Sequence, residues 1–502
     1  MKQLKINYTS DMHGFMPEML EIAKELTKDE NTINIDCGDS TAGSSFTRFL
    51  IHEDEHLSYN QHMIATAMNI GKYDYITLGN HDFNFGLHPL KIYLENIRAE
   101  CICANVTWEN APIKKWEIIT LTNGLKIGIT GIVTDFINVW EKPENIKGIT
   151  ISPPYEAVKL AFNEIKDKCD FTICIYHGGF EGDIQTGQIL LYNGENIGLE
   201  ICNTLDFDLL LTGHQHNLIE SHKIKNTHIV QPGAYGTNYI IIDVIFENGE
   251  KPKITSKLHK PEKIENIKEF FENIKIESKK SNISDNIVLL ERLEKTLMRE
   301  KDWLEEPIGT IEKELLPDDK LKMALYGSNI ADFFNKIQIN ATNAQISVTS
   351  LANNISGFTK DVSIKDVMNN YPYMNHLVIL EIDYHSLKSV IEQSLSYFLM
   401  IDGEITINPR FTTPKSEHYN FDYFYGIEIE YNLNEPIGNR VISIKKDGKE
   451  LNENEKYTLT TNNYRATGTG GYDAYKSCKL IKEYKEDVTD LIIEYIKKKP
   501  NC

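Results

Sequence analysis

The chain has 502 residues, of which 41% are hydrophobic and 25% are charged, and it carries a formal net charge of −20. This composition is typical of globular proteins, and it excludes a disordered chain, a collagen-like chain and a small disulfide scaffold. We expect no long nucleic acid as a partner, because the acidic balance would repel a polyphosphate backbone. At roughly 150 residues per domain, the length indicates two to four domains.

The sequence gives no indication of membrane insertion. The N-terminus MKQLKINYTSDMHG has no apolar core of signal-peptide length, and no apolar run approaches the roughly 20 residues that a membrane helix needs. We therefore expect a cytoplasmic protein without a membrane partner, unless a leader has been removed. The eight cysteines form no zinc-ribbon spacing and are expected to be reduced core residues. The oligomeric state is not indicated.

The first 245 residues repeat one pattern, in which a short β-rich apolar run ends abruptly in polar and glycine residues. The five runs are LKINY followed by TSDMHG, NTINID by CGDS, YDYITL by GNHDFNFG, DFTICIY by HGGFEGD, and DFDLLL by TGHQHN. Helix-like stretches such as 17–28 and 155–168 lie between them, and 125–133 and 238–246 are further expected strands. Alternating strands and helices predict an α/β layered domain over residues 1–250.

The composition changes after this region. Residues 251–306 are rich in Glu, Lys, Leu and Ile and predict a helical connector. A second domain is expected over 307–502. It mixes a helix at roughly 318–337 with strands at 376–383, 425–432 and 455–462, which indicates an α+β fold.

The polar residues that follow the five runs are the candidates for chemistry. Ligands of open α/β sheets bind beyond the carboxyl ends of the strands, so these residues should meet at one edge. Carboxylate, imidazole and amide oxygen are ligands for divalent transition metals, and this many groups suits two ions about 3.5–4 Å apart with a bridging carboxylate. A lone histidine at a strand end would be an ordinary surface or core residue, but five such endings in order are hard to attribute to chance. The candidates are Asp11, His13, Asp39, Asn80, His81, Asp82, His177, His214 and His216.

Through these residues the sequence resembles the calcineurin-like metallophosphoesterases and, over nearly the whole chain, the 5′-nucleotidase/2′,3′-cyclic-nucleotide 2′-phosphodiesterase family. The resemblance implies a four-layer αββα sandwich followed by a substrate-binding C-terminal domain. It also implies that the first ion is held by Asp11, His13, Asp39 and His216, and the second by Asp39, Asn80, His177 and His214. The metal itself is left open among Mn, Zn, Fe, Co and Mg, which share this ligand chemistry.

Two cations lower the pKa of a water molecule, which can then attack the phosphate without a side-chain nucleophile. His81 directly follows Asn80, so it should lie near the phosphate and be able to protonate the leaving oxygen. Asp82 either orients His81 or caps a following helix. In many 5′-nucleotidases of the family an aspartate three residues after this histidine forms a dyad with it, and Asn84 stands there in this chain. An amide can position an imidazole but lacks the full charge of a carboxylate.

Aromatic residues beside loops of the second domain are candidates for binding a nucleotide base, because two rings can sandwich a purine or pyrimidine. Tyr464 has this role by resemblance. Its partner is expected among Tyr419, Phe421, Phe424 and Tyr425, with Tyr419 and Phe424 as the chosen candidates, and the sequence does not indicate which of these rings faces the base. Gly470 belongs to the adjoining glycine-rich turn. Arg465 is expected either to contact phosphate or ribose or to make a structural hydrogen bond, and Arg410 is a further phosphate or ribose candidate.

The motifs NHDFN, YNFD and NNYRATGTGGY resemble the 2′,3′-cyclic-nucleotide 2′-phosphodiesterase/3′-nucleotidase branch. The segment SLANNISG (350–357) lacks the arginine that the 5′-nucleotidase branch often carries near this place. We therefore expect a dimetal hydrolase for small nucleotides that favours 2′,3′-cyclic and 3′-nucleotides. The alternatives are a 5′-nucleotidase, a hydrolase of UDP-sugars or nucleotide diphosphates, an enzyme for cyclic dinucleotides, and a catalytically inactive nucleotide-binding protein.

Overall fold

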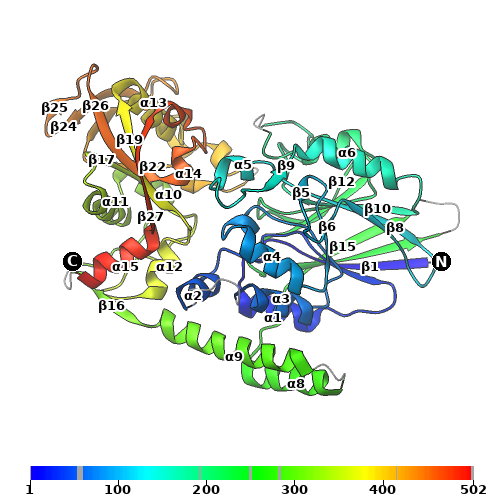
Figure 1. The fold of residues 1–502 in the computed structure, drawn as a ribbon. Helices are drawn as coiled ribbons and strands as arrows, with labels where there is room; N and C mark the ends of the chain where they lie inside the picture. The colour runs from blue at the N-terminus through cyan, green and yellow to red at the C-terminus, as the bar shows by residue number, and fades with distance from the viewer. Residues whose placement is uncertain are drawn as a thin grey trace. The chain divides into compact units, whose positions relative to one another are not determined.

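A computed structural model of the chain describes residues 2–53, 60–190, 194–247, 251–280, 284–413 and 415–498 (Figure 1). The chain divides into two compact units, Met1–Lys301 and Asp302–Cys502. Within the described residues, no helix combines the length and the apolar character that crossing a membrane requires.

The first unit contains a seven-stranded sheet with the order β15-β14-β1-β2-β3-β4-β6. Strands β1 to β4 pair in parallel, so their carboxyl ends lie at one edge of the sheet. The strands are β1 (Lys2–Thr9), β2 (Thr32–Asp36), β3 (Tyr75–Ile76), β4 (Glu100–Ile102), β6 (Ile113–Lys114), β14 (Tyr239–Phe246) and β15 (Lys253–His259).

A six-stranded sheet with the order β12-β13-β11-β10-β8-β7 forms the second layer of strands. Its strands β8, β10, β11 and β13 are parallel, which again gathers their carboxyl ends at one edge. The strands are β7 (Trp116–Thr120), β8 (Lys126–Val133), β10 (Phe171–His177), β11 (Leu209–Thr212), β12 (Leu218–Ile224) and β13 (Thr227–Pro232); a separate pair joins β5 (Val106–Trp108) and β9 (Ile149–Ile151).

The two sheets pack face to face and are covered by helices on their outer faces. Alternate residues such as Ile6 and Tyr8 of β1 and Ile173 and Ile175 of β10 form the core between the sheets. Helices α1, α3 and α4 contribute to the core on one outer face, and α6 and α7 to the core on the other. This is the expected αββα sandwich. Its helices are α1 (Met16–Glu25), α2 (Ser45–Glu53), α3 (Asn60–Ile70), α4 (Leu87–Asn96), α5 (Ile137–Trp140), α6 (Pro154–Ile165) and α7 (Gly198–Thr204), with a 3₁₀ turn η2 at His81–Phe83.

The segment expected to be a helical connector is helical only in its second part. Residues Lys253–His259 form strand β15, because the half-buried Ile254, Ser256 and Leu258 alternate with exposed side chains and the strand pairs with β14. Helices α8 (Ile267–Lys280) and α9 (Ser284–Leu304) follow. Lys275 of α8 forms an ion pair with Glu294 of α9 at 2.8 Å, and buried side chains of both helices join a core of the first unit.

The second unit is built on a five-stranded sheet with the order β22-β17-β26-β19-β27. Two hydrophobic cores surround it, one containing α13 and one containing α11, α12 and α15. Its strands are β16 (Pro307–Thr310), β17 (Ile346–Ser350), β18 (Asp361–Ser363), β19 (His376–Asp383), β20 (Phe398–Ile401), β21 (Glu404–Ile407), β22 (Asp422–Tyr425), β23 (Glu428–Tyr431), β24 (Val441–Lys446), β25 (Lys449–Glu450), β26 (Lys456–Asn462) and β27 (Lys479–Asp487). Its helices are α10 (Lys320–Tyr326), α11 (Asn329–Thr342), α12 (Ile364–Asn370), α13 (Tyr384–Leu395), α14 (Asn463–Ala466) and α15 (Val488–Lys498), with 3₁₀ turns η3 (Pro409–Phe411), η4 (His418–Asn420) and η5 (Asp473–Ser477).

Two expected elements of this unit are divided. The helix predicted over 318–337 is two helices, because Gly327 adopts a φ of +89° after α10 and the Ser328 side chain caps α11 by accepting from the Ala331 N–H. The strand predicted over 425–432 is also interrupted. Strand β22 pairs with β17, whereas β23 pairs with β24 in a different sheet.

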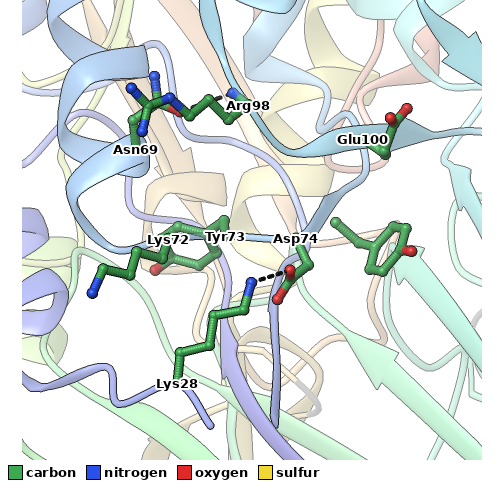
Figure 2. Close-up of a pocket in the computed structure, with 8 residues that line it drawn as sticks. Lys28, Asn69, Lys72, Tyr73, Asp74, Arg98 and Glu100 are labelled. Atoms are coloured by element: carbon green, nitrogen blue, oxygen red, sulfur yellow. Dashed lines mark hydrogen bonds and ion pairs between the residues drawn. The ribbon is translucent and has the colours of Figure 1, made fainter. Parts of the chain in front are cut away.

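A cavity of about 350 Å³ opens at the amino ends of β3 and β4 (Figure 2). Lys28, Lys72 and Arg98 contribute its cationic groups, and Asp74 and Glu100 its carboxylates. Lys28 forms an ion pair with Asp74, which the figure marks with a dashed line. This cavity lies at the edge of the sheet opposite to the carboxyl ends, and it is therefore separate from the polar residues that follow those ends.

Candidate metal centre

The polar residues that follow the parallel strands of the first unit meet at the carboxyl edge of both sheets. Three strand ends of the seven-stranded sheet supply Asp11 and His13, then Asp39, then Asn80; the six-stranded sheet supplies His177 from β10, and His214 and His216 after β11. The Tyr8 hydroxyl donates to the Thr212 carbonyl oxygen at 2.5 Å, which joins the ends of β1 and β11 across the two sheets. All seven predicted ligands therefore lie in one place.

Five of these seven residues adopt the left-handed backbone region, with φ between 51° and 67°: Asp11, His13, Asp39, His214 and His216. This conformation is uncommon for residues other than glycine, and each case of such strain costs about 1–3 kcal/mol. It persists only where the surrounding structure determines it, and it concentrates at active sites. The strand ends are therefore bent in a way that aims these side chains at a common point.

One group of donors consists of Asp11, His13 and His216, whose ligand atoms all lie within 4.8 Å of one another. The His216 Nε2 is 3.4 Å from Asp11 Oδ1 and 3.1 Å from His13 Nε2. Two ring nitrogens that face each other beside a carboxylate match the nitrogen and oxygen donors that transition-metal cations take.

The second group is centred on Asp39 and His177, which with Asp11 also place their ligand atoms within 4.8 Å. The His177 Nε2 lies 3.2 Å from Asp39 Oδ2 and 3.2 Å from Asn80 Oδ1. The same Asn80 oxygen is 2.8 Å from His214 Nδ1. Asp39 Oδ2 is also 3.8 Å from His13 Nε2, so this carboxylate stands between the two groups.

The outward nitrogen of three of the histidines faces an acceptor. His13 Nδ1 is 2.9 Å from the Ala42 carbonyl, and His177 Nδ1 is 2.6 Å from the Cys37 carbonyl. His214 Nε2 is 3.0 Å from the Glu195 carboxylate. Carbonyls and carboxylates only accept, so each outward nitrogen can donate a proton to its acceptor, and with a cation in the site the inner nitrogen would offer its lone pair. Metal-binding histidines are held in this way, so the residues fit a divalent cation.

The charges in the site depend on one another. Burial opposes the ionisation of Asp39, but the positive charge of His177 lowers the pKa of this carboxyl well below its usual value. Burial also opposes the charge on His177, yet Asp39 raises the pKa of that imidazole well above its usual value. Burial lowers the pKa of His13 to about 3, so its ring is neutral at physiological pH. The site thus combines charged carboxylates with imidazole nitrogens, as a cation site requires.

His81 lies beside both groups. Its backbone N–H donates to Asp39 Oδ1 at 2.7 Å, and its ring centroid is 5.1 Å from that of His13. Its Nδ1 is 2.8 Å from the Asn84 side-chain oxygen. The ring is thus placed next to the predicted ligands and oriented by Asn84.

Asp82 has a different environment from either of its expected roles. Its carboxylate accepts from the backbone N–H groups of Asp39, Ser40, Thr41 and Gly79 at 2.8–3.0 Å, and from the Thr41 hydroxyl at 2.8 Å. These contacts hold the loop that presents Asp39. Burial and the charge of Asp39 raise the pKa of Asp82.

In the second unit the predicted base-binding aromatics have different surroundings. Tyr464 is a half-buried residue of α14, directly after β26. Tyr419 is half-buried, and its ring centroid lies 6.3 Å from that of Tyr373. Phe424 of β22 packs against the hydrophobic core of the unit. All three side chains are half-buried, so each keeps part of its surface open.

The Arg465 guanidinium is buried and bound by protein groups. Its Nε donates to Asp422 Oδ1 at 3.1 Å, and the ring of Tyr472 lies 4.2 Å below it. Its two terminal nitrogens donate to Asn420 Oδ1 and to the carbonyls of Thr469 and Tyr419. Of the two roles expected for Arg465, these contacts correspond to structural hydrogen bonding, and they fix the backbone that carries Tyr419.

Gly470 belongs to the turn that Arg465 supports. Its φ is +80°, and a Cβ at this position would lie 2.4 Å from Asn420 Oδ1, so a side chain cannot be accommodated. The Gly470 carbonyl accepts from the Gln393 side chain at 2.7 Å, and Gln393 also contacts Arg410. Arg410 is exposed and lies beside this turn.

Sequence reasoning missed four residues that contact the site. Trp140 stacks on His214 at 5.6 Å, Glu195 accepts from the same histidine, and Glu141 binds Asn84. Tyr235 has a φ of 64° and lies with its ring 5.2 Å from His216. Tyr235 follows β13 in a glycine-containing turn, the same pattern as the other strand ends, so it could have been found; the other three lie outside such turns.

Two family models match the chain. Residues 4–218 match the calcineurin-like phosphoesterases, and residues 307–477 match the C-terminal domain of 5′-nucleotidases. The fold and the site therefore define a metallophosphoesterase, a class of hydrolases that use divalent metals. The chain belongs to the calcineurin-like phosphoesterases that carry a 5′-nucleotidase C-terminal domain.

Several relatives have names that concern nucleotides. The chain is 23% identical to a trifunctional nucleotide phosphoesterase of Bacillus subtilis over 95% of this chain, but it spans only 35% of that protein. It is 22% identical to a 2′,3′-cyclic-nucleotide 2′-phosphodiesterase/3′-nucleotidase of Haemophilus influenzae, over 97% of this chain and 81% of the relative. A Staphylococcus aureus crystal structure with α-ketoglutarate, provisionally described as a 5′-nucleotidase, superposes with a TM-score of 0.86 at 26% identity, over 99% of this chain and 97% of that one.

Proposed function

We propose that this protein hydrolyses phosphate esters of nucleotides with two divalent cations. The supporting observation is the convergence of two donor groups on either side of Asp39. One cation would be held by Asp11, His13, Asp39 and His216, and the other by Asp39, Asn80, His177 and His214. A bound pair of this kind neutralises phosphate charge and lowers the pKa of a water molecule. Mn, Zn, Fe, Co and Mg all suit these donors.

The chain's own residues then orient the reaction. His81, beside the donors, would give a proton from Nε2 to the leaving sugar oxygen, because its Nδ1 is engaged by Asn84. Asp82 would act by holding the Asp39 loop. In the C-terminal unit, Tyr464 and Tyr419 would stack on the base, and Arg465 would support the segment of Tyr419.

For the substrate we propose 2′,3′-cyclic nucleotides and 3′-nucleotides. The motifs NHDFN, YNFD and NNYRATGTGGY and the name of the Haemophilus influenzae relative favour this preference. The segment 350–357 without arginine also favours it, because a guanidinium fork for a 5′-phosphate is missing from that segment. The description of the Staphylococcus aureus structure favours 5′-nucleotides as the second candidate.

A substrate panel tests the proposal. Protein loaded with a defined amount of Mn²⁺ would be incubated with 2′,3′-cyclic AMP, 3′-AMP, 5′-AMP and UDP-glucose, and the products would be separated by chromatography. We expect 2′,3′-cyclic AMP to give 3′-AMP and then adenosine, with Asp39→Asn as the inactive control. Turnover of 5′-AMP alone would overturn the preference. Nucleotide binding without turnover with either Mn²⁺ or Co²⁺ would overturn the catalytic proposal and favour a binding protein.

A further inference from the structure

The last residue of the short helix α5 and the residue that follows it contact groups beside the candidate metal centre. Trp140 stacks on His214, with ring centroids 5.6 Å apart and an interplanar angle of 20°. Glu141, the next residue, reaches Asn84 instead, and its Oε2 accepts from Asn84 Nδ2 at 2.8 Å. Asn84 Oδ1 in turn is 2.8 Å from His81 Nδ1. These two short contacts form a continuous chain from the Glu141 carboxylate through an amide to the His81 ring.

The direction of each hydrogen bond in this chain follows from Glu141. A carboxylate only accepts, so the Asn84 side chain must present its NH₂ group to Glu141 and its oxygen to His81. The Asn84 oxygen also only accepts, so His81 must carry a proton on Nδ1. Nε2 is then the nitrogen that can exchange a proton with a substrate.

Glu141 is itself firmly placed. Its Oε1 accepts from the Lys142 backbone N–H at 2.9 Å and from Asn145 Nδ2 at 2.8 Å. The Asn145 amide also donates to the Asn84 backbone carbonyl at 2.9 Å. Both oxygens of Glu141 are therefore engaged, and the same asparagine ties the loop of Glu141 to the loop of Asn84.

We propose that Glu141 is a positioning residue that acts on His81 through Asn84. Position 84 has no carboxylate of its own. Asn84 and Glu141 together connect the His81 ring to a carboxylate through two hydrogen bonds. The inference rests on the proposed function. When the bond between phosphorus and the leaving sugar oxygen breaks, that oxygen takes the proton from His81 Nε2, while His81 Nδ1 and the Asn84 amide keep their protons and Glu141 stays a carboxylate, so that Asn84 and Glu141 only hold the ring.

Exchanging the carboxylate and the amide between positions 84 and 141 tests whether Glu141 positions His81. In Glu141→Gln, position 141 can donate as well as accept, so the Asn84 amide is no longer fixed. In Asn84→Asp, two carboxylates face each other. The double variant Asn84→Asp/Glu141→Gln restores an ordered chain, because the glutamine amide donates to the aspartate and the aspartate accepts from His81 Nδ1. Glu144→Gln, an exposed glutamate three residues away, is the matched control.

We expect each single variant to lower kcat for 3′-AMP by about 10- to 100-fold with little change in KM. The double variant should return to within about threefold of the parent, since the two positions are coupled. p-Nitrophenyl phosphate should lose less than about threefold in every variant, because its leaving group departs without a proton. Equal losses on both substrates, or no recovery in the double variant, would overturn the inference.

A second readout is independent of turnover. ¹⁵N-histidine NMR of the metal-free protein should show His81 protonated on Nδ1 in the parent and in the double variant, with a mixture of tautomers in Glu141→Gln; His81→Asn assigns the signal. The same tautomer in all variants would contradict the proposal. A parent protein that cleaves no phosphate ester would instead refute the proposed function, and the NMR result would still decide the hydrogen-bond chain.

Discussion

The contact between Glu195 and His214 predicts that one carboxylate selectively tunes one of the two cation sites. Glu195 accepts from His214 Nε2 at 3.0 Å and thereby keeps Nδ1 directed toward Asn80. Loss of such a partner ordinarily weakens metal binding by about 10- to 100-fold, or about 1.4–2.7 kcal/mol. Here the Glu195 side chain is 21% exposed, and Trp140 still stacks on the ring, so we expect Glu195→Gln to cost about tenfold.

Isothermal titration with Mn²⁺ would measure this effect. The parent should bind two ions, and Glu195→Gln should weaken only the site that contains His214, leaving the site of Asp11 and His216 unchanged. Glu109→Gln, at an exposed position, is the control. Unchanged affinity at both sites, or an equal loss at both in a folded protein, would refute the reasoning.

Three further predictions concern the shared carboxylate of Asp39, the buried Arg465 and the pH dependence of metal binding. Asp39→Asn should retain the fold by circular dichroism but bind fewer than two Mn²⁺ per chain by mass spectrometry; two tightly bound ions would contradict its place between the donor groups. Arg465→Met should lower the free energy of unfolding in urea by about 3–5 kcal/mol, because Asp422 would be left as an unpaired buried charge, and a loss below about 1 kcal/mol would refute the structural role. Because Asp39 raises the pKa of His177, the His177 ring holds a proton at neutral pH, and a cation must displace that proton to bind. The apparent Mn²⁺ affinity should therefore rise by up to about tenfold per pH unit. An affinity that stays constant between pH 6 and 8 would contradict this prediction.

The layered architecture and the convergence of the candidate metal ligands were predictable from the sequence for the same reason. Buried parallel strands are apolar runs, and each run here ends in a polar side chain such as Asp11, Asp39 or His177. Because parallel strands end at one edge, strand order along the chain was enough to bring these residues together. The strand β15 was missed since its alternating Lys, Ile, Ser and Leu residues lie in a charged, helix-like region.

The supporting residues could not be predicted in this way. Glu141 reaches Asn84 and Glu195 reaches His214 through the paths of the loops that carry them, and no periodicity of the sequence encodes such paths. Arg465 could be either a substrate contact or a structural residue by its sequence, and only its burial against Asp422 and Tyr472 separates the two. The unexpected role of Asp82 has the same origin, because its partners are backbone groups of a distant loop.

The most direct test of the account is an anomalous diffraction measurement at the manganese edge on crystals soaked in Mn²⁺. We predict two peaks, one among Asp11, His13 and His216 and one among Asn80, His177 and His214, with Asp39 between them. A single peak, or manganese bound away from these residues, would contradict the central claim.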